Sequence, residues 1–398
     1  MSGLDRQRIS FDGKIGLALS GGGSRAIAFH LGCLRALRDI GILNQVTTIS
    51  SVSGGSVLAA LYCQTPGDFD EFEAKTRRLL QRGFMRSTFW MAISSKEGLK
   101  SLMIGTAIAV DRLVAFFVRH CLRLVGLRRL IRAPWLRESP IRRGSSRTTI
   151  LRRVFSALFD HQTLPQLRQD RPKLIIVACE LQTKSAFYFA ADGVGSWQLG
   201  VTAPDDIEVA NAVAASAAFP LLLPALDEVM AFTKDGVTSR HRVILTDGGV
   251  YDNLALAPLW PGRDPAVSLH VDHYPRIIAC RAGYALKRTS APSFFFTRMS
   301  AVFEGVHARA QNLTMNRIFD LKRAGDVEAF LIPYLSQKDD LLTVPGSDLI
   351  TAEQVADYPT DFSAMSQEWV DKLVVRGEQV TRALVAQYWS EPTKEETS

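Results

Sequence analysis

Residues Ile49 to Ala60 read "ISSVSGGSVLAA". The stretch begins as an apolar run typical of a β-strand, breaks at two glycines and continues as a run typical of a helix. A buried strand that turns sharply into a helix is a building unit of an α/β sheet, so this stretch indicates the fold class. It also raises a chemical question, because it contains four serines: Ser50, Ser51, Ser53 and Ser56.

The same pattern continues on both sides of this stretch. "KIGLALS", Lys14 to Ser20, predicts a strand, and Ser24 to Gly41 predicts a helix that stops at a glycine. Because apolar strands alternate with helices, we expect an α/β fold with a mostly parallel central sheet covered by helices on both faces. The other expected strands are Lys173–Thr183, Ala186–Asp192, His241–Gly249, Arg276–Gly283 and Val327–Tyr334, and the other expected helices are Ser56–Cys63, Ser300–Arg323 and Met365–Trp389.

The 398 residues are 47% hydrophobic and 22% charged, which suits one folded domain over 1–398 with a frayed, disordered tail at 390–398. Five scattered cysteines, an odd number, suit reduced core thiols, and the N-terminus lacks the apolar run of a secretory signal. We therefore expect a cytoplasmic protein, and the spacing of the cysteines predicts no metal site.

The formal charge of +7 is unevenly distributed. Lys75 to Arg153 holds 19 Lys and Arg but 3 Asp and Glu, a charge of +16, so the rest of the chain carries −9. The strands that carry the expected motifs lie outside this segment, in about 12–71 and 160–335. We expect 72–159 to be a basic, helical insertion that could contact an anionic surface.

The centre of this insertion is apolar but is interrupted by Asp111 and Arg112. Arg112, Arg119 and Arg123 recur at helical spacings and share a face opposite Leu, Val and Phe residues. This pattern predicts an amphipathic helix lying in a membrane surface, with a helix packed on its own domain as the alternative. Neither apolar piece alone has the ~20 residues of a membrane span. Nucleic acid is not an expected partner, because no nucleic-acid motif accompanies the basic residues.

Three consecutive glycines, Gly21, Gly22 and Gly23, separate the first strand from the first helix. Their backbone amides and the helix N-terminus favour an anion. Gly21, Gly23 and Ala26 match the dinucleotide fingerprint, but no Asp or Glu lies between Ile40 and Gly67 to hold a ribose. A dinucleotide-dependent oxidoreductase therefore remains only an alternative.

The other anion that this loop suits is the oxyanion of an acyl-transfer intermediate. The amides of Gly22, Gly23 or Ser24 are its candidate donors. Arg25, in the first turn of the helix, is placed either to contact a lipid phosphate or to brace the loop.

Among the four serines, Ser53 alone has the surroundings of a nucleophile elbow. The elbow needs small residues two positions before and after the serine, and these are Ser51 and Gly55, with Gly54 between. Ser56 would begin the helix as an N-cap.

A serine needs a base to become nucleophilic at neutral pH. None of the seven histidines lies in a catalytic motif, but "RVILTDGG" places Asp247 at the end of an apolar strand, before Gly248 and Gly249. At the C-terminal edge of a parallel sheet it could reach Ser53, and burial would make it a better base. Taken alone, Asp-Gly-Gly predicts a turn.

Together these residues resemble the patatin-like phospholipase family, through "GGGSRA", "SVSGG", "ASAAFPLLLPAL" and "DGG" in that order between Gly16 and Asn253. The resemblance implies a three-layer fold, a Ser-Asp dyad without histidine, no calcium or other cofactor, and hydrolysis of lipid acyl esters. Carried over, Ser53 is the nucleophile, Asp247 is the base, and Gly21 to Gly23 with Arg25 form the oxyanion loop. Ser51 departs from the elbow's usual glycine, and Ala26 departs from a glycine often found after the arginine.

The expected function is therefore a serine acyl hydrolase acting on phospholipids or lysophospholipids, peripherally associated with membranes. A non-catalytic lipid-binding protein on the same scaffold is the alternative. Headgroup preference, regiochemistry and oligomeric state stay open.

Overall fold

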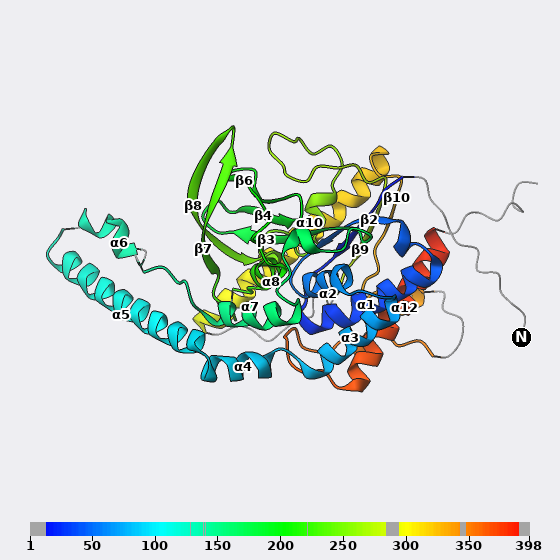
Figure 1. The fold of residues 1–398 in the computed structure, drawn as a ribbon, viewed down its shortest axis with the longest axis horizontal. Coiled ribbons are helices and arrows are strands. Elements are labelled where there is room, and N and C mark those ends of the chain that lie inside the picture. Colours follow the sequence, from blue (N-terminus) through cyan, green and yellow to red (C-terminus); the bar gives the residue numbers. More distant parts are fainter. Residues whose placement is uncertain are drawn as a thin grey trace, which may run out of the picture.

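The computed structural model describes residues 13–389, apart from positions 128, 138, 140 and 221 and the stretches 284–293 and 343–347 (Figure 1). The tail predicted at 390–398 lies outside the described residues. The strands are β1 Ile15–Leu19, β2 Val46–Ser51, β3 Lys173–Glu180, β4 Ser185–Ala190, β5 Gly193–Ser196, β6 Gly200–Thr202, β7 Leu226–Lys234, β8 Val237–Asp247, β9 Arg276–Cys280 and β10 Ala329–Leu331.

The described strands form one ten-stranded sheet in the order β10-β9-β1-β2-β3-β4-β5-β6-β7-β8. From β10 to β3 all neighbours run parallel, as predicted. From β3 onward every pairing is antiparallel, so the sheet is mixed and the prediction of a mostly parallel sheet is wrong. Short turns join β3 to β4, β4 to β5, β5 to β6 and β7 to β8, and such turns connect antiparallel strands, whereas parallel neighbours require longer crossovers.

Strand β8 returns to β3, because the register pairs Leu245 with Glu180 and Asp247 with Ala178. Strand β2 lies along the same β3 in the parallel direction and ends where Ser51 pairs with Ile176. The C-terminal ends of β2 and β8 therefore meet head-on at the middle of β3.

Helices cover both faces of the sheet. Leu17, Leu19 and Ile49 belong to a core shared with α1, α2, α3, α7, α8 and α12, whereas Ala18 and Val52 face a second core that includes Ile318 of α10. The alternation along β1 follows from the two-residue period of a strand. The helices are α1 Gly23–Ile40, α2 Gly54–Gln64, α3 Phe69–Arg82, α4 Met85–Ser94, α5 Lys96–Leu124, α6 Pro134–Arg137, α7 Arg147–Leu158, α8 Val209–Ser216, α9 Gly249–Asp252, α10 Phe295–Ala324, α11 Ala352–Val355 and α12 Gln367–Tyr388.

Two glycines allow α1 and α12 to touch along their backbones. A Cβ on Gly32 would lie 1.9 Å from the carbonyl oxygen of Val374, and one on Gly377 would lie 2.1 Å from that of Phe29. The C-terminal helix is thus packed directly onto the helix that begins at the glycine loop.

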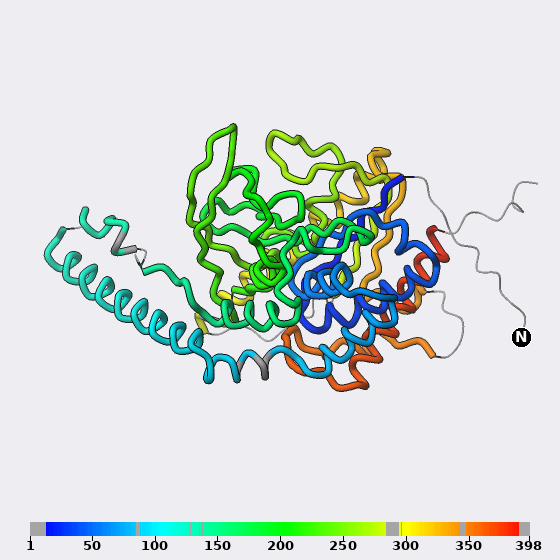
Figure 2. Tube along the Cα trace, viewed as in Figure 1, coloured from blue at the N-terminus to red at the C-terminus, as the bar shows by residue number. Residues whose placement is uncertain are grey.

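The predicted insertion divides into two parts. Phe72 and Leu80 of α3 and Phe155 of α7 lie in the main core, so the ends of 72–159 are parts of the body. Between them, α5 leaves the body as a long arm, which α6 caps at its tip (Figures 1 and 2).

The arm helix differs from the sequence prediction in its continuity. Asp111 and Arg112 do not interrupt it, because charged side chains on an exposed helix can reach solvent, and α5 runs for 29 residues, about 43 Å. It is long and apolar enough to cross a membrane, by length and composition alone. Its first turn is packed on the body, where Glu97 accepts a hydrogen bond from Arg153 of α7, but exposed apolar side chains, including Phe116 and Phe117 at 57% each, show that much of its apolar surface is not covered by its own domain.

Candidate active site

Ser53 lies between β2 and α2 in a strained backbone conformation, with φ of 52° and ψ of −119°. This geometry defines a nucleophile elbow. A Cβ on Gly54 would lie 2.2 Å from the carbonyl oxygen of Gly23, and one on Gly55 would lie 2.4 Å from that of Leu19. The two glycines are required because α2 starts directly against the backbone of the glycine loop.

Ser216 of α8 fixes the backbone of the elbow through hydrogen bonds. Its Oγ accepts a 2.9 Å hydrogen bond from the Ser53 amide and donates to the carbonyl oxygen of Val177 at 2.7 Å. Ser56 Oγ is 3.0 Å from the same hydroxyl. One small polar side chain therefore fixes the nucleophile's backbone to the centre of β3, beside the point where β2 and β8 meet.

Asp247 ends β8 and is buried, with 4% of its surface exposed. Its Oδ1 accepts a 2.6 Å hydrogen bond from the amide of Gly249. Burial raises the pKa of the Asp247 carboxyl to about 7, against the opposing effects of hydrogen bonds from Gly249 and the Ser53 hydroxyl. The carboxyl therefore lies near the Ser53 side chain, and its pKa suits a general base near neutral pH.

Ser51, which replaces the usual first glycine of the elbow, fits without strain. It is fully buried and its backbone does not have a positive φ. Its Oγ is 3.5 Å from the carbonyl oxygen of Ile175. The tight turn is supplied by Ser53, Gly54 and Gly55 instead.

The glycine loop presents two free amides. The amide of Gly21 donates to the carbonyl oxygen of Asn253 at 3.1 Å, and that of Ser24 donates to the carbonyl oxygen of Asp361 at 2.7 Å, so neither is available to a ligand. Gly22 and Gly23, with φ of 144° and 60°, make no such amide bond within the described chain. Of the three predicted donors, Gly22 and Gly23 are the ones that remain.

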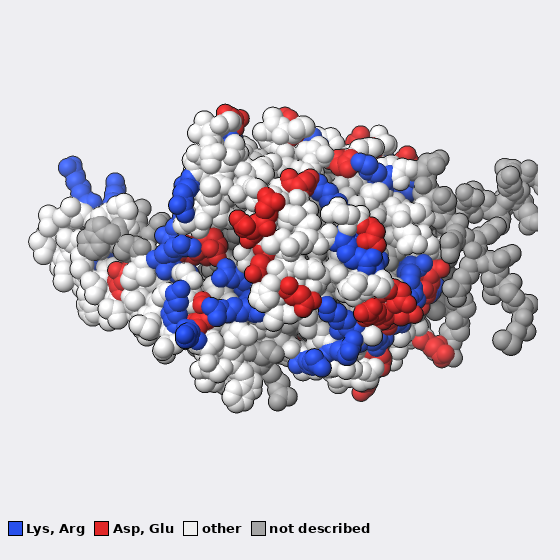
Figure 3. All heavy atoms as spheres, viewed as in Figure 1, with Lys and Arg blue, Asp and Glu red and all other residues white. Residues whose placement is uncertain are grey.

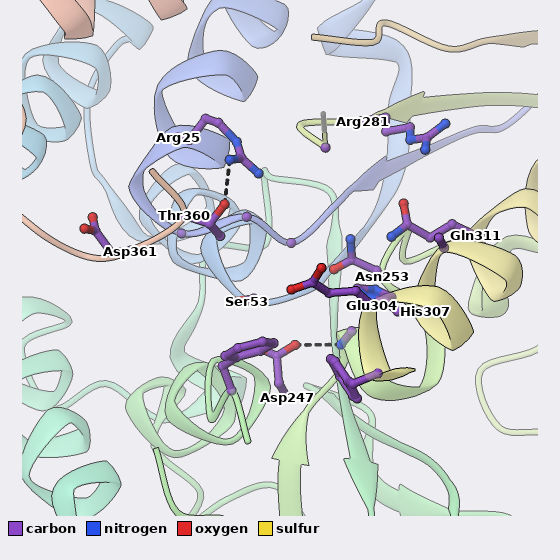
Figure 4. A pocket seen from close by; sticks show the side chains of 18 of the residues that line it. Arg25, Ser53, Asp247, Asn253, Arg281, Glu304, His307, Gln311, Thr360 and Asp361 are labelled. Carbon is purple, nitrogen blue, oxygen red and sulfur yellow. Dashed lines mark hydrogen bonds between the residues drawn. The ribbon is translucent and has the colours of Figure 1, made fainter. Parts of the chain in front are cut away.

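Arg25 braces the loop. Its Nε donates to the carbonyl oxygen of Ala282 at 2.9 Å, and its Nη1 donates to Thr360 Oγ1 at 2.5 Å and to the carbonyl oxygen of Tyr358 at 3.4 Å. Figure 4 shows the bond to Thr360. Of the two roles predicted for Arg25, this geometry supports bracing.

Ser53, Asp247 and the glycine loop line one pocket of about 750 Å³ (Figure 4). A cavity of this size is typical of a small-molecule site. Its other walls come from distant parts of the chain: Phe219, Leu222, Asn253, Arg281, Gly283, Phe303, Glu304, His307, Ala308, Gln311, Asn312, Tyr334, Ala356, Thr360, Asp361 and Phe362.

Several of these residues carry no signal in the sequence, because α10 and the 356–362 loop reach the pocket only through the tertiary fold. His307 lines the pocket, and its Nε2 is buried without a hydrogen-bond partner among the described residues. Burial lowers its pKa, so the ring is neutral at pH 7. Among those residues no histidine hydrogen-bonds to Ser53 or Asp247.

One group in the described chain has ligand spacing for a metal. His30, Cys33 and Cys280 place three ligand atoms within 4.8 Å of one another, all buried. His30 Nε2 is 3.0 Å from the carbonyl oxygen of Ser20. The group supplies three ligands, where structural zinc uses four, and none of its members lines the pocket.

A strained serine, a buried carboxyl and two free amides around one cavity define the class of serine hydrolases. The family model of patatin-like phospholipases matches residues 17–260. The chain belongs to the patatin-like phospholipase family, and membership implies a lipid acyl hydrolase. A patatin-like phospholipase domain-containing protein of Caenorhabditis elegans is 34% identical over 105 residues, 24% of this chain and 8% of that protein.

Solved structures show the same fold. Human GIVD cytosolic phospholipase A2 matches 93% of this chain and 61% of its own, with a TM-score of 0.51 and 14% identity. The same enzyme in complex with methyl gamma-linolenyl fluorophosphonate and terbium chloride matches 95% and 59%, with a TM-score of 0.50 and 14% identity. The chain thus spans about three fifths of these structures and a small part of the worm protein.

Proposed function

We propose that this protein is a serine acyl hydrolase that cleaves fatty-acyl esters of membrane phospholipids or lysophospholipids. The observation that supports it most is the strained Ser53 in the same pocket as a buried Asp247 whose pKa is about 7. The buried carboxyl is a stronger base than an exposed one, and Ser53 lines the same pocket.

In the first step the Ser53 Oγ–H proton passes to Asp247 while Oγ bonds to the ester carbonyl carbon. The carbonyl electrons move to the oxygen, which accepts hydrogen bonds from the amides of Gly22 and Gly23. Loss of one such donor typically costs ~3 kcal/mol of transition-state stabilisation. The intermediate then expels the alcohol, which takes the proton from Asp247, and the acyl group stays on Ser53.

In the second step water attacks the acyl-Ser53 carbonyl, and Asp247 takes a proton from the water. The second tetrahedral intermediate collapses, the fatty acid leaves, and the proton returns from Asp247 to Ser53 Oγ. No histidine is needed, because a carboxyl with a pKa near 7 accepts and returns protons at neutral pH.

The arm supports a membrane-bound substrate. Figure 3 shows Lys and Arg gathered where the arm joins the body and again at its tip, while much of the arm between them is uncharged on the face drawn. Burial and the charges of Arg112 and Arg147 lower the pKa of Arg143, against the attraction of Asp227, so these basic side chains lie close enough to repel one another. An apolar helix with a basic base suits an anionic membrane surface, and we propose a cytoplasmic, peripherally associated enzyme.

A fluorophosphonate probe tests the nucleophile. We expect labelling of the wild type and none of Ser53→Ala, with lipid hydrolysis lost in Ser53→Ala and in Asp247→Asn. Undiminished labelling of Ser53→Ala contradicts the assignment. Liposome binding by both variants separates a lost reaction from lost folding, and a wild type that binds liposomes without releasing fatty acid supports the non-catalytic alternative.

A further inference from the structure

Two arginines line the pocket within the described chain, and they differ in what holds them. Arg25 is bound by backbone and side-chain oxygens and braces the glycine loop. Arg281 has a buried Nε without a hydrogen-bond partner, and no carboxylate of the described residues pairs with it. The stretch 284–293 that follows contains no Asp or Glu. Arg281 is therefore a cation whose Nε–H has no acceptor among the described residues.

The backbone directs Arg281 toward the pocket. Its neighbours Cys280 and Ala282 bond to Ser20, through the Ser20 amide at 3.1 Å and Ser20 Oγ at 2.9 Å. Both neighbours are buried, and side chains alternate between the two faces of an extended segment. The side chain of Arg281 therefore lies on the face opposite to those of Cys280 and Ala282. Its own amide donates to the carbonyl oxygen of Pro333 at 2.8 Å, which fixes this position.

Tyr334 forms a platform for the guanidinium, whose central carbon lies 4.5 Å from the ring centroid. Stacking orders the plane of an arginine and leaves the N–H groups at its edge free for an anion. Two parallel N–H donors match the oxygens of a phosphate.

Gln311 of α10 approaches the same place from another element. A Cβ on Gly283 would lie 3.8 Å from Arg281 Nε and 3.9 Å from Gln311 Oε1, so both polar groups border this glycine. Figure 4 shows Arg281 and Gln311 on the side of the pocket away from Asp247. The pocket also has apolar walls from Phe219, Leu222 and Phe303, and such a cavity suits an amphiphile with an anionic head.

We propose that Arg281 is the residue that recognises the phosphate of the substrate, so that phosphate-bearing lipids are preferred over neutral acylglycerols. The inference rests on the proposed function and deepens it, since it names the substrate class and moves the phosphate contact from Arg25 to Arg281.

The test compares a lysophospholipid with a monoacylglycerol of the same acyl chain, each in neutral-detergent micelles. Arg281→Met should lower kcat/KM for the lysophospholipid by about tenfold or more, mainly through KM, and leave the monoacylglycerol within about twofold. Arg281→Lys should give an intermediate loss. The matched control is Arg317→Met, which removes an arginine stacked 5.0 Å over Trp260 outside the pocket lining and should change neither substrate.

Equal losses on both substrates, or no loss on the lysophospholipid, overturn the role of Arg281. Binding to the Ser53→Ala protein supplies a readout without catalysis, in which Arg281→Met should weaken the lysophospholipid about tenfold and spare the monoacylglycerol. If Arg281 binds only inorganic phosphate in calorimetry while lysophospholipid binding is unchanged, the lipid assignment is wrong. A wild type that binds the lysophospholipid through Arg281 but cleaves neither ester contradicts the proposed function alone.

Discussion

Ser51 and Asp247 both pair with the same edge of β3, at positions two residues apart. Their strands, β2 and β8, run toward each other along that edge. Ser51 ends β2 opposite Ile176, and Asp247 ends β8 opposite Ala178. This head-on meeting brings the nucleophile Ser53 and the acid Asp247 to the same place, because each lies within two residues of the end of its strand.

The burial of Asp247 predicts the pH dependence of activity. With a pKa of about 7, the carboxyl is protonated and inactive as a base at pH 5 and ionised at pH 9. We expect kcat/KM for a soluble acyl ester to rise about tenfold per pH unit below pH 7 and to level off above it. Rates measured from pH 5 to 9 check this, and a flat profile between pH 5 and 8 contradicts the assignment.

The same shift predicts an effect on stability. The raised pKa means that the folded state binds more protons than the unfolded state between about pH 4 and pH 7, so stability falls as the pH rises through that window. Asp247→Asn removes this loss and should be more stable than wild type at pH 8 by a few kcal/mol, at ~1.4 kcal/mol per pKa unit. Urea unfolding at pH 8 and pH 4 measures it, and the difference should vanish at pH 4.

The backbone at Ser53 predicts an order of stability among inactive variants. A φ of 52° with ψ of −119° is costly for any residue with a Cβ, by about 1–3 kcal/mol, and glycine relieves it. Ser53→Gly should therefore be more stable than Ser53→Ala by about 1 kcal/mol in chemical unfolding. Equal stability of the two variants would show that the elbow is unstrained.

Gly54 predicts a steric effect at the oxyanion loop. Gly54→Ala places a Cβ 2.2 Å from the Gly23 carbonyl oxygen, which must move with its amide, so activity should fall at least about tenfold and stability should drop. The control is Gly105→Ala on the exposed arm helix, where no atom lies within 4 Å of the new Cβ. Since alanine is the better helix former, that variant should gain about 0.5–1 kcal/mol.

The arm predicts a separation of membrane binding from chemistry. Replacing both Phe116 and Phe117 by serine should reduce partition into anionic liposomes several-fold and leave hydrolysis of a soluble ester unchanged, because α5 is remote from the pocket. Val237→Ser, at a still more exposed position of the β7–β8 hairpin, should change neither. Unaltered liposome binding by the Phe116 and Phe117 variant excludes the arm as the binding element.

Local patterns in the sequence predicted the strands β1, β2 and β3, the family and the positions of Ser53 and Asp247, because an elbow and a strand end are short-range features. The direction of β8 was not predictable, since it depends on how the whole segment between β3 and β8, α8 included, folds back. Ser216, Arg281 and Asp361 come from separate segments, and only the tertiary fold brings each of them to the elbow or to the pocket. The sequence did not predict that α5 is continuous, because the charged residues Asp111 and Arg112 interrupt its apolar pattern even though an exposed helix accommodates them.

The hydrogen bond from the Ser24 amide to the carbonyl oxygen of Asp361 has a practical consequence for the design of truncated variants. The family match ends at residue 260, but the loop 356–362 closes over the glycine loop, and α12 packs backbone to backbone on α1. A fragment cut at residue 260 would lose β9, β10 and one wall of the cavity together. The boundary drawn by homology therefore does not mark an independently folding unit, because the sheet and the pocket are completed by residues beyond 260.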